Sequence, residues 1–452
     1  MLENQDTICA LATANGIGAI GVIRISGDQS IQIVSQLFSK DLRNEKSHTV
    51  HFGTIASKQG NLIDEVLVTI FADGKSFTGE ESVEISCHGS TFIQEKIIEA
   101  IIESGARLAN PGEFTQRAFI NGKLDLSQAE AVADLITSQS RSAHDIALKQ
   151  LRGKFSNELK SLREQLIHFA SLVELELDFA EEDVEFADRT ELKALVTEVL
   201  QLLRRLAHSF ELGNAIKNGV PVAIVGAPNT GKSTLLNQLL GEDRAIVSDI
   251  AGTTRDVIEE TLSIDGIVFR LIDTAGIREG AEEIEAMGIE RSKAKIDQSK
   301  IVLCLADASS EQSVQEVKAW VTELKATYPT KKIGLIINKS DLKKVDLEKD
   351  QISISAKHGQ NMDDLNKWIV DAVTGDFDMA NETIVTNVRH RDALLRTAEA
   401  LQTAKDGLES GITGDFIAMD IRQAMHWLGS ITGDISEDDL LANIFKNFCI
   451  GK

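Results

Sequence analysis

The chain has 452 residues, 42% of them hydrophobic, which is enough for about three domains that each bury a core. Its net charge of −23 excludes a general attraction to nucleic acid, so any RNA contact would need a local basic patch or a basic partner. No apolar run approaches the ~18 residues that span a membrane, and the N-terminus lacks the basic region of a signal peptide.

The four cysteines, Cys9, Cys87, Cys304 and Cys449, are far apart in the sequence and form no C-x-x-C pair. This spacing argues against zinc and against disulfides, and it suits a reducing compartment. We therefore expect a cytoplasmic protein without zinc and without membrane segments.

Residues 1–118 are expected to form a small α/β domain. A composition rich in β-branched residues predicts strands over 7–13, 19–26, 62–71 and 82–86. Isoleucines then recur at helical spacing from Ile93 to Ile102, and Gly105 is a suitable stop for that helix.

Three charged residues, Arg24, Glu84 and Lys123, lie in or beside apolar segments. Taken by themselves, they fit solvated charges at the ends of strands. The α/β region contains no motif that specifies a chemistry on its own.

Residues 119–215 change to a helical pattern. Ser127-Gln-Ala-Glu130 matches a capping box in front of an apolar stripe. Longer amphipathic helices are expected over 155–177 and 192–206. The acidic run 181–185 between them fits a solvated turn better than a metal or partner site.

Residues 216–375 alternate strands with helices, which predicts a mostly parallel sheet with helices on both faces. The apolar run 220–225 leads into Gly-Ala-Pro-Asn-Thr-Gly-Lys-Ser, which matches the phosphate-binding loop G-x-x-x-x-G-K-[ST]. Its glycines let backbone N–H groups point at phosphate oxygens, and the next helix adds its positive end. Lys232 would reach the β- and γ-phosphates, and the Ser233 hydroxyl would bind magnesium.

Two further motifs would serve the metal and the γ-phosphate. Gly252-Thr-Thr-Arg-Asp256 supplies Thr254 as a second magnesium ligand. Asp273-Thr-Ala-Gly276 follows a predicted strand over 267–272, so Asp273 would hold water on the metal and the Gly276 N–H would meet the γ-phosphate.

Two more motifs would recognise guanine. Asp341 of Asn338-Lys-Ser-Asp341 would accept hydrogen bonds from N1–H and the 2-amino group, which adenine lacks. Ser355-Ala-Lys357 would close over the base. Five such motifs in this order, at the carboxyl ends of predicted strands, are specific to a GTPase because ligands bind at that edge of a sheet.

The hydrolysis step departs from Ras-like proteins, where a glutamine after D-x-x-G positions the attacking water. This chain has Ile277 there, so another group must act, and the acidic segment 279–285 is nearest. Extra positive charge would come from Arg255 or Arg278, or from a monovalent cation beside Asn229. Asn229 also fits a simple turn residue.

The whole chain resembles one family, the bacterial tRNA-modification GTPases called MnmE or TrmE. The matching segments are Asp6-Thr-Ile, Arg24-Ile-Ser-Gly27, Phe77-Thr-Gly-Glu80, Cys87-His-Gly89, Pro111-Gly-Glu-Phe114, Lys123-Leu-Asp-Leu126, the phosphate-binding loop, Gly252-Thr-Thr-Arg-Asp256 and the terminal Phe448-Cys-Ile-Gly-Lys452.

This resemblance implies an N-terminal domain that dimerises and binds 5-formyltetrahydrofolate through Arg24, Glu84, Lys123 and Lys452, which replaces the interpretation of solvated charges. It implies that Cys449 is needed for modification and that Glu285 orients water.

The resemblance also implies a potassium ion held by Asn229, Thr253 and the carbonyls of Ser248 and Ile250. With the motifs it assigns magnesium to Ser233 and Thr254 and catalysis to Glu285, Lys232 and Thr254. The residues expected to contact GTP are Asn229, Thr230, Gly231, Lys232, Ser233, Thr234, Ser248, Thr253, Thr254, Asp273, Thr274, Ala275, Gly276, Asn338, Lys339, Asp341, Ser355, Ala356 and Lys357.

The family further implies a homodimer and an FAD-dependent partner, MnmG. Together they would add a carboxymethylaminomethyl-type group to C5 of the wobble uridine of tRNA. Because the chain carries a charge of −23, we expect the partner to supply most contacts to tRNA phosphates.

The GTPase motifs alone leave two other classes open. A ribosome-assembly GTPase switch usually adds a basic RNA-binding module or a second GTPase domain, and a membrane-transport GTPase needs membrane-spanning helices; the sequence has neither. We expect four segments: a folate-binding domain over 1–118, a helical bundle from 119–215 and 376–452, and an inserted GTPase domain over 216–375.

Overall fold

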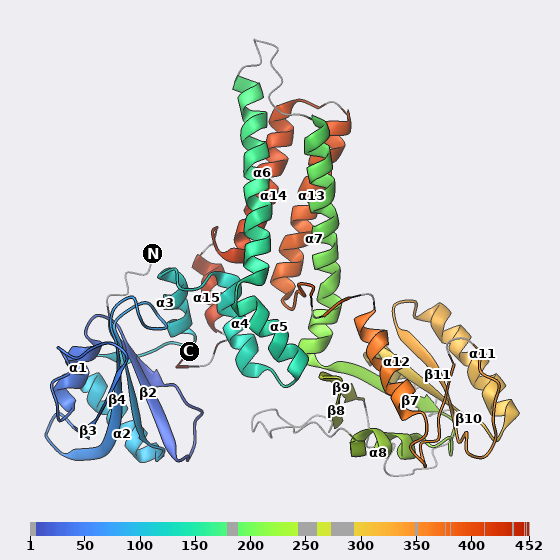
Figure 1. The fold of residues 1–452 in the computed structure, drawn as a ribbon, viewed down its shortest axis with the longest axis horizontal. Coiled ribbons are helices and arrows are strands. Elements are labelled where there is room, and N and C mark those ends of the chain that lie inside the picture. Colours follow the sequence, from blue (N-terminus) through green and yellow to red (C-terminus); the bar gives the residue numbers. More distant parts are fainter. Residues whose placement is uncertain are drawn as a thin grey trace. The chain divides into compact units, whose positions relative to one another are not determined.

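The computed structural model describes residues 6–178, 189–242, 260–272, 293–348, 351–375, 377–379, 381–410, 412–435, 438–446, 448, 450 and 451. The chain forms two compact units. One unit comprises residues 1–136, 148–197 and 399–452, and the other comprises residues 137–147 and 198–398. Two long helices, α7 (Arg189–Asn218) and α13 (Val388–Ser410), contribute to both units (Figure 1).

The first unit contains a six-stranded sheet in the order β3-β4-β5-β2-β1-β6. Neighbouring strands are antiparallel except for the parallel pair β1 and β6. The strands are β1 (Ile8–Leu11), β2 (Ile20–Ser26), β3 (Thr49–Ala56), β4 (Leu62–Phe71), β5 (Ser82–His88) and β6 (Arg107–Leu108).

One face of this sheet packs against helices to form the hydrophobic core of the domain. Side chains alternate along a strand, so Val83, Ile85 and Cys87 of β5 are buried while the residues between them are partly exposed. Helices α1 (Ser30–Leu37) and α2 (Thr91–Glu103) cover the buried face with Ile33 and Ile97.

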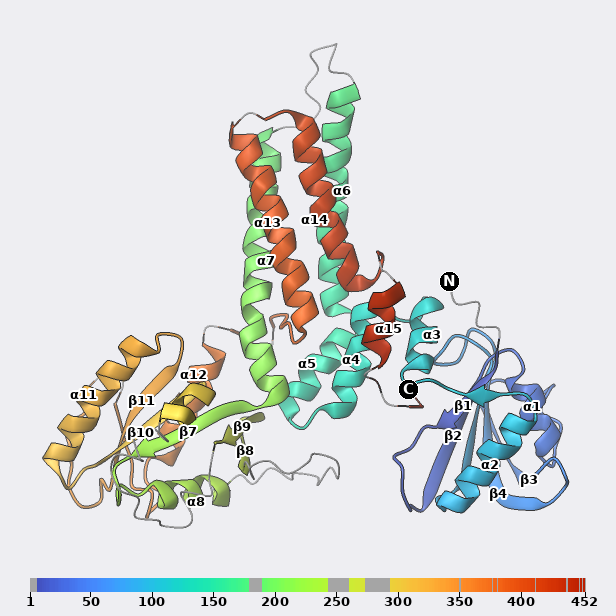
Figure 2. The same ribbon diagram turned by 180° about the vertical axis from the view of Figure 1, so that it is seen from behind.

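The remaining helices of the first unit pack by their apolar stripes. Helix α6 (Lys154–Asp178) lies against α14 (Gly414–Thr432), as both views show, and α15 (Asp438–Lys446) contacts α3 (Glu113–Ile120) (Figure 2). These contacts join helices that are far apart in the sequence.

Helix α4 (Leu126–Thr137) begins with a capping box, but not with the predicted one. Asp125 Oδ1 accepts from the Gln128 N–H at 3.0 Å, and Gln128 Oε1 accepts from the Asp125 N–H at 2.9 Å. The predicted cap, Ser127, lies inside the helix, where its hydroxyl is 2.8 Å from that of Ser156.

The second unit contains the predicted parallel sheet, in the order β12-β11-β10-β7-β9-β8, with only β8 antiparallel. Its strands are β7 (Val220–Gly226), β8 (Glu260–Ile264), β9 (Ile267–Leu271), β10 (Ile301–Asp307), β11 (Lys332–Asn338) and β12 (Gln351–Ser353).

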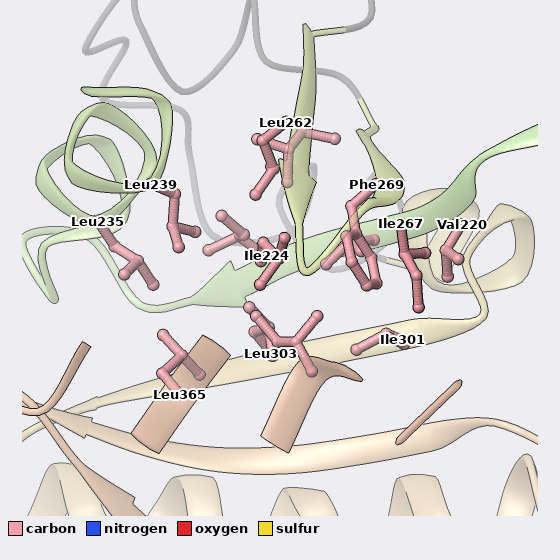
Figure 3. Packing of buried hydrophobic residues seen from close by; sticks show 14 of the residues in the cluster. Val220, Ile224, Leu235, Leu239, Leu262, Ile267, Phe269, Ile301, Leu303 and Leu365 are labelled. Carbon is pink, nitrogen blue, oxygen red and sulfur yellow. The ribbon is translucent and has the colours of Figure 1, made fainter. Parts of the chain in front are cut away.

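Helices cover both faces of this sheet, as predicted. On one face, Leu235 and Leu239 of α8 (Lys232–Glu242) and Leu365 of α12 (Met362–Thr374) pack against strand residues such as Ile224 and Leu303 (Figure 3). On the other face, α11 (Glu311–Thr327) buries Val317, Val321 and Leu324. Both faces are buried, which explains the continuous apolar runs of β7 and β10.

The first turns of α5 (Arg141–Leu151) belong to the second unit. Ile146 and Ala143 pack into the same core as Ile267 and Phe269. The Ser142 N–H donates to the Gly266 carbonyl at 3.1 Å. Gly266 forms the turn between β8 and β9, so the start of α5 is seated on that turn.

This contact predicts the effect of Gly266→Ala. Gly266 has a φ of +77°, and a Cβ there would lie 3.2 Å from the Arg141 Cβ. We expect the free energy of unfolding, measured in urea, to fall by about 1–2 kcal/mol because left-handed strain and crowding add.

The matched control is Gly375→Ala, since Gly375 has a φ of +53° with nothing within 4 Å of its Cβ position. Equal losses in the two variants would show that the contact with α5 adds nothing to the strain.

Candidate functional site

The carboxyl ends of the central strands of the second unit lie at one edge of the sheet. In the parallel register, Leu305 of β10 is opposite Gly226 of β7, and Asp307 is opposite Asn338 of β11. Ile337 is in turn opposite Ser353 of β12. The loops after these strands therefore converge at the edge where α/β sheets bind ligands.

The loop between β7 and α8 has the backbone that its sequence predicts. Gly226 and Gly231 have φ values of +154° and +96°, and Asn229 has a φ of +62°. The Thr230 hydroxyl donates to the Ala227 carbonyl at 2.9 Å. This loop precedes the first turn of α8, so its N–H groups lie next to the positive end of the helix, an arrangement that suits an anion.

Asn338 joins this loop to the segment Ser355–Lys357. Its buried amide donates to the Thr230 carbonyl at 2.8 Å and accepts from the Ala356 N–H at 3.0 Å. A Cβ on Gly231 would overlap the Asn338 amide nitrogen, so only glycine leaves room for the link. One side chain thus fixes the phosphate-binding loop against the predicted base-binding segment.

Lys232 lies over the loop that precedes it. Its Nζ donates to the carbonyls of Gly226 and Ala227, both at 2.8 Å. Burial lowers the pKa of this lysine, and the nearby charge of Lys295 lowers it further. A phosphate oxygen is a charged and stronger acceptor than a carbonyl, so the ammonium is positioned to exchange these two partners for phosphate.

Asp341 lies beside Ser355, as the guanine motif requires. The Ser355 hydroxyl donates to Asp341 Oδ1 at 2.6 Å, and this bond holds the pKa of Asp341 below its ordinary value. His358 Nε2 is 3.7 Å from Asp341 Oδ2. The carboxylate is therefore ionised at neutral pH and can accept from the two N–H groups of guanine.

The structure brings together nine of the predicted GTP-binding residues: Asn229, Thr230, Gly231, Lys232, Asn338, Lys339, Asp341, Ser355 and Ala356. Ser233 and Thr234 follow in the first turn of α8, and Lys357 is exposed beside Ala356. Several predicted residues lie outside the described part of the chain: Ser248, Ile250, Thr253, Thr254, Asp273, Thr274, Ala275, Gly276, Glu285, Cys449 and Lys452.

Other sequence features also fall outside the described residues. These are the acidic run 181–185, Arg255, and the segment with Ile277 and Arg278.

Asp307 is a site residue that the sequence motifs did not indicate. Its Oδ2 accepts from Lys339 Nζ at 2.6 Å. Burial alone would raise the pKa of Asp307, but the hydrogen bonds from Lys339 and Ser309 lower it below the ordinary value. In the sequence, Asp307 is an acidic residue at the end of an apolar run. This pattern is too common to identify a functional residue.

The second predicted site lies in the first unit, where Arg24 and Glu84 are direct cross-strand partners on β2 and β5. Arg24 Nε and Nη2 bond Glu84 Oε1 at 2.9 and 2.8 Å. The guanidinium lies 5.6 Å from the Phe77 ring centroid and 5.8 Å from that of Phe114. The interpretation of this pair as solvated strand-end charges is therefore wrong, because both residues lie mid-strand and are paired.

Lys123 follows α3, and its Nζ donates to the Gly74 carbonyl at 2.6 Å. Its side chain also lies 3.3 Å from the position of a Cβ on Gly79. The loop between β4 and β5, which carries Phe77, Gly74 and Gly79, thus contacts both Arg24 and Lys123.

Within the described part of the chain, no helix has the length and hydrophobicity to cross a membrane. Among the same described residues, no three or more His, Cys, Asp or Glu are grouped so that they could hold a metal ion.

The Asn338 link predicts that Asn338→Ala weakens both the fold and nucleotide binding. It would leave the buried Thr230 carbonyl and Ala356 N–H without partners, which costs roughly 2–4 kcal/mol in urea unfolding. GDP titration should show weaker binding in the same variant. Asn218→Ala removes an exposed amide at the end of α7 and should cost less than about 0.5 kcal/mol.

The chain is similar to known proteins along its whole length. Two family descriptions match: "GTP-binding protein TrmE N-terminus" over residues 7–123 and "MnmE helical domain" over residues 126–449. The G domain of the T. maritima FeoB iron transporter is 23% identical over 34% of this chain and 98% of that one, with a TM-score of 0.25.

Full-length relatives are far more similar. The tRNA modification GTPase MnmE of Flavobacterium johnsoniae is 52% identical over 99% of this chain and 100% of its own length. That of Cytophaga hutchinsonii is 53% identical over 100% of this chain and 98% of its own length. The chain belongs to the MnmE (TrmE) family of tRNA modification GTPases.

Proposed function

We propose that this chain is a homodimeric, potassium-activated GTP hydrolase in tRNA modification. With an FAD-dependent partner similar to MnmG, it would add a carboxymethylaminomethyl-type group to C5 of the wobble uridine, using a tetrahydrofolate one-carbon unit. The observation that carries the proposal is the convergence of the phosphate-binding loop, Asn338, Asp341 and Ser355 at one sheet edge. The full-length match to tRNA modification GTPases favours this function over a ribosome-assembly switch.

The phosphates and the base of the nucleotide would bind at different ends of this sheet edge. The loop N–H groups and Lys232 would hold the phosphates, and Asp341 would select guanine over adenine. An unpaired carboxylate opposite adenine costs several kcal/mol, so one residue is sufficient for the selection.

Magnesium fits the loop because the Ser233 hydroxyl is a hard oxygen donor in the first turn of α8, beside the phosphate surface. Ser233 and Thr254 would ligate it, and Asp273 would hold its water. Bound there, the metal supplies charge neutralisation for the β- and γ-phosphates.

Asn229 is the described residue that would bind the potassium ion. It is exposed in the phosphate-binding loop, and its left-handed conformation is one that asparagine adopts more readily than most residues with a side chain. Thr253 and the carbonyls of Ser248 and Ile250 would complete the site. The cation would supply charge at the phosphates, and Glu285 would orient the water that Ile277 cannot.

GTP turnover with potassium or sodium chloride at equal ionic strength tests this function. We expect turnover in sodium to be at least about tenfold slower, since transition-state charge supplied by an arginine in other GTPases is worth ~10³-fold or more. Glu285→Ala should keep GDP affinity within about twofold while turnover collapses.

Equal rates in the two salts would refute the cation. Loss of GDP binding in Glu285→Ala would show that Glu285 does more than orient water.

The first unit supports folate binding by Arg24, Glu84, Lys123 and Lys452, with Cys449 needed for modification. Glu84 is paired with Arg24 yet keeps 28% of its side chain exposed, so it can accept from the N–H groups of a pterin. Lys123 offers a cation for the acidic glutamate tail of 5-formyltetrahydrofolate. Phe77 adds an aromatic surface beside the pair.

Calorimetric titration with 5-formyltetrahydrofolate tests this site. Arg24→Gln should weaken binding by about tenfold or more, because a partly buried guanidinium that orders a carboxylate is lost. Arg43→Gln makes the same change in an exposed pair with Asp41 of the same domain and should have no effect. No binding to the unchanged protein would remove folate from the proposal and favour the assembly switch.

A further inference from the structure

Asp307 has a fixed orientation at the nucleotide edge. It is the last residue of β10, and Ser309 donates to its Oδ1 from both the backbone N–H, at 2.9 Å, and the hydroxyl, at 2.7 Å. The Asp307 N–H is also bonded, to the Ser313 hydroxyl at 3.1 Å. These bonds occupy one carboxylate oxygen and leave the other to bind elsewhere.

That second oxygen binds Lys339. The Lys339 Nζ lies 2.6 Å from Asp307 Oδ2, and the two side chains are 31% and 18% exposed. Lys339 has a φ of +66°, a left-handed conformation that is unfavourable for residues with a Cβ atom. Lys339 therefore combines an ion pair at its head group with an uncommon backbone conformation.

Lys339 lies between two residues that have different roles. Asn338, before it, holds the phosphate-binding loop, and Asp341, two residues later, lies where guanine is recognised. A lysine whose head group is anchored presents its four-carbon stem as an apolar strip, which suits the flat face of a purine. If the head group were free, ordering the stem would cost side-chain entropy when the nucleotide binds.

We propose, on the basis of the GTP-binding function above, that Asp307 is a positioning residue for guanine nucleotides: it anchors Lys339 so that the lysine stem lies against the base. Asp307 itself contacts no part of the nucleotide. Its effect belongs to binding rather than to hydrolysis, because Lys339 is at the base end of the site and the γ-phosphate is at the Lys232 end.

A simpler role for Asp307 is local, since its bonds with Ser309 also shape the turn before α11. A double-mutant cycle separates the two roles. If Asp307 acts through Lys339, its substitution has an effect only while the lysine ammonium is present. If Asp307 only shapes the turn, its substitution has the same effect in both backgrounds.

The experiment measures GDP affinity by titration, and turnover at saturating GTP, in the full chain. Asp307→Asn should weaken GDP binding by about fivefold, the upper limit for a partly exposed ion pair, with kcat within about twofold of the unchanged protein. Asp346→Asn removes an exposed carboxylate of the same domain and should change neither.

The cycle uses Lys339→Met, which keeps an apolar stem without the charge. In that background, Asp307→Asn should change GDP affinity by less than about twofold. An equal loss in both backgrounds, a fall in kcat with unchanged affinity, or no effect of Asp307→Asn alone would each overturn the role of Asp307. Absence of GDP binding by the unchanged protein would instead refute the GTPase function.

Discussion

The buried amide of Asn338 is the constraint on which the nucleotide edge depends. It is one side chain with a donor and an acceptor, and each is used on a different loop: Thr230 on one side and Ala356 on the other. Both loops would otherwise bury a backbone group without a partner, which costs more than the hydrogen bond contributes. The phosphate-binding loop and the segment that we propose for base recognition are therefore held together, and Gly231 is required because any side chain would enter the space of the amide.

Much of the fold could be predicted because the physical signal is local. Strands β7 and β10 are buried on both faces, so they read as unbroken apolar runs, and the loop after β7 has a spacing that only a phosphate-binding backbone requires. Strand β3 was not predicted, because its exposed Val50 and Phe52 lie on the solvent side of an edge strand, and no apolar run marks it. Solvent exposure is a tertiary property that the local pattern does not contain.

Where two local patterns compete, packing decides between them. Asp125–Gln128 and Ser127–Glu130 both have capping-box spacing, and the second was chosen from the sequence. The Ser127 hydroxyl instead meets Ser156 on α6, a residue 29 positions away, which leaves Asp125 to cap the helix. The same limit applies to Asp307 and Lys339, which are 32 residues apart in the sequence. A sequence motif identifies only residues within one segment, whereas the register of β10 and β11 brings these two side chains together.

Exposure separates the ion pairs that stabilise the fold from those that we propose for ligand sites. Arg117 and Glu113 are 4% and 2% exposed and belong to a network of ion pairs, since Glu113 also binds Arg107 and Arg117 also binds Asp6 and Glu80. A buried network of this kind serves the fold. Arg24–Glu84 and Asp307–Lys339 are partly exposed, and solvent screening leaves pairs of that kind with about 1 kcal/mol or less of stability. Their contribution to the fold is too small to explain two charges fixed at this edge and on this sheet face. Holding a side chain ready for a ligand is the role that we propose for both pairs, because the ordering is then complete before the ligand arrives.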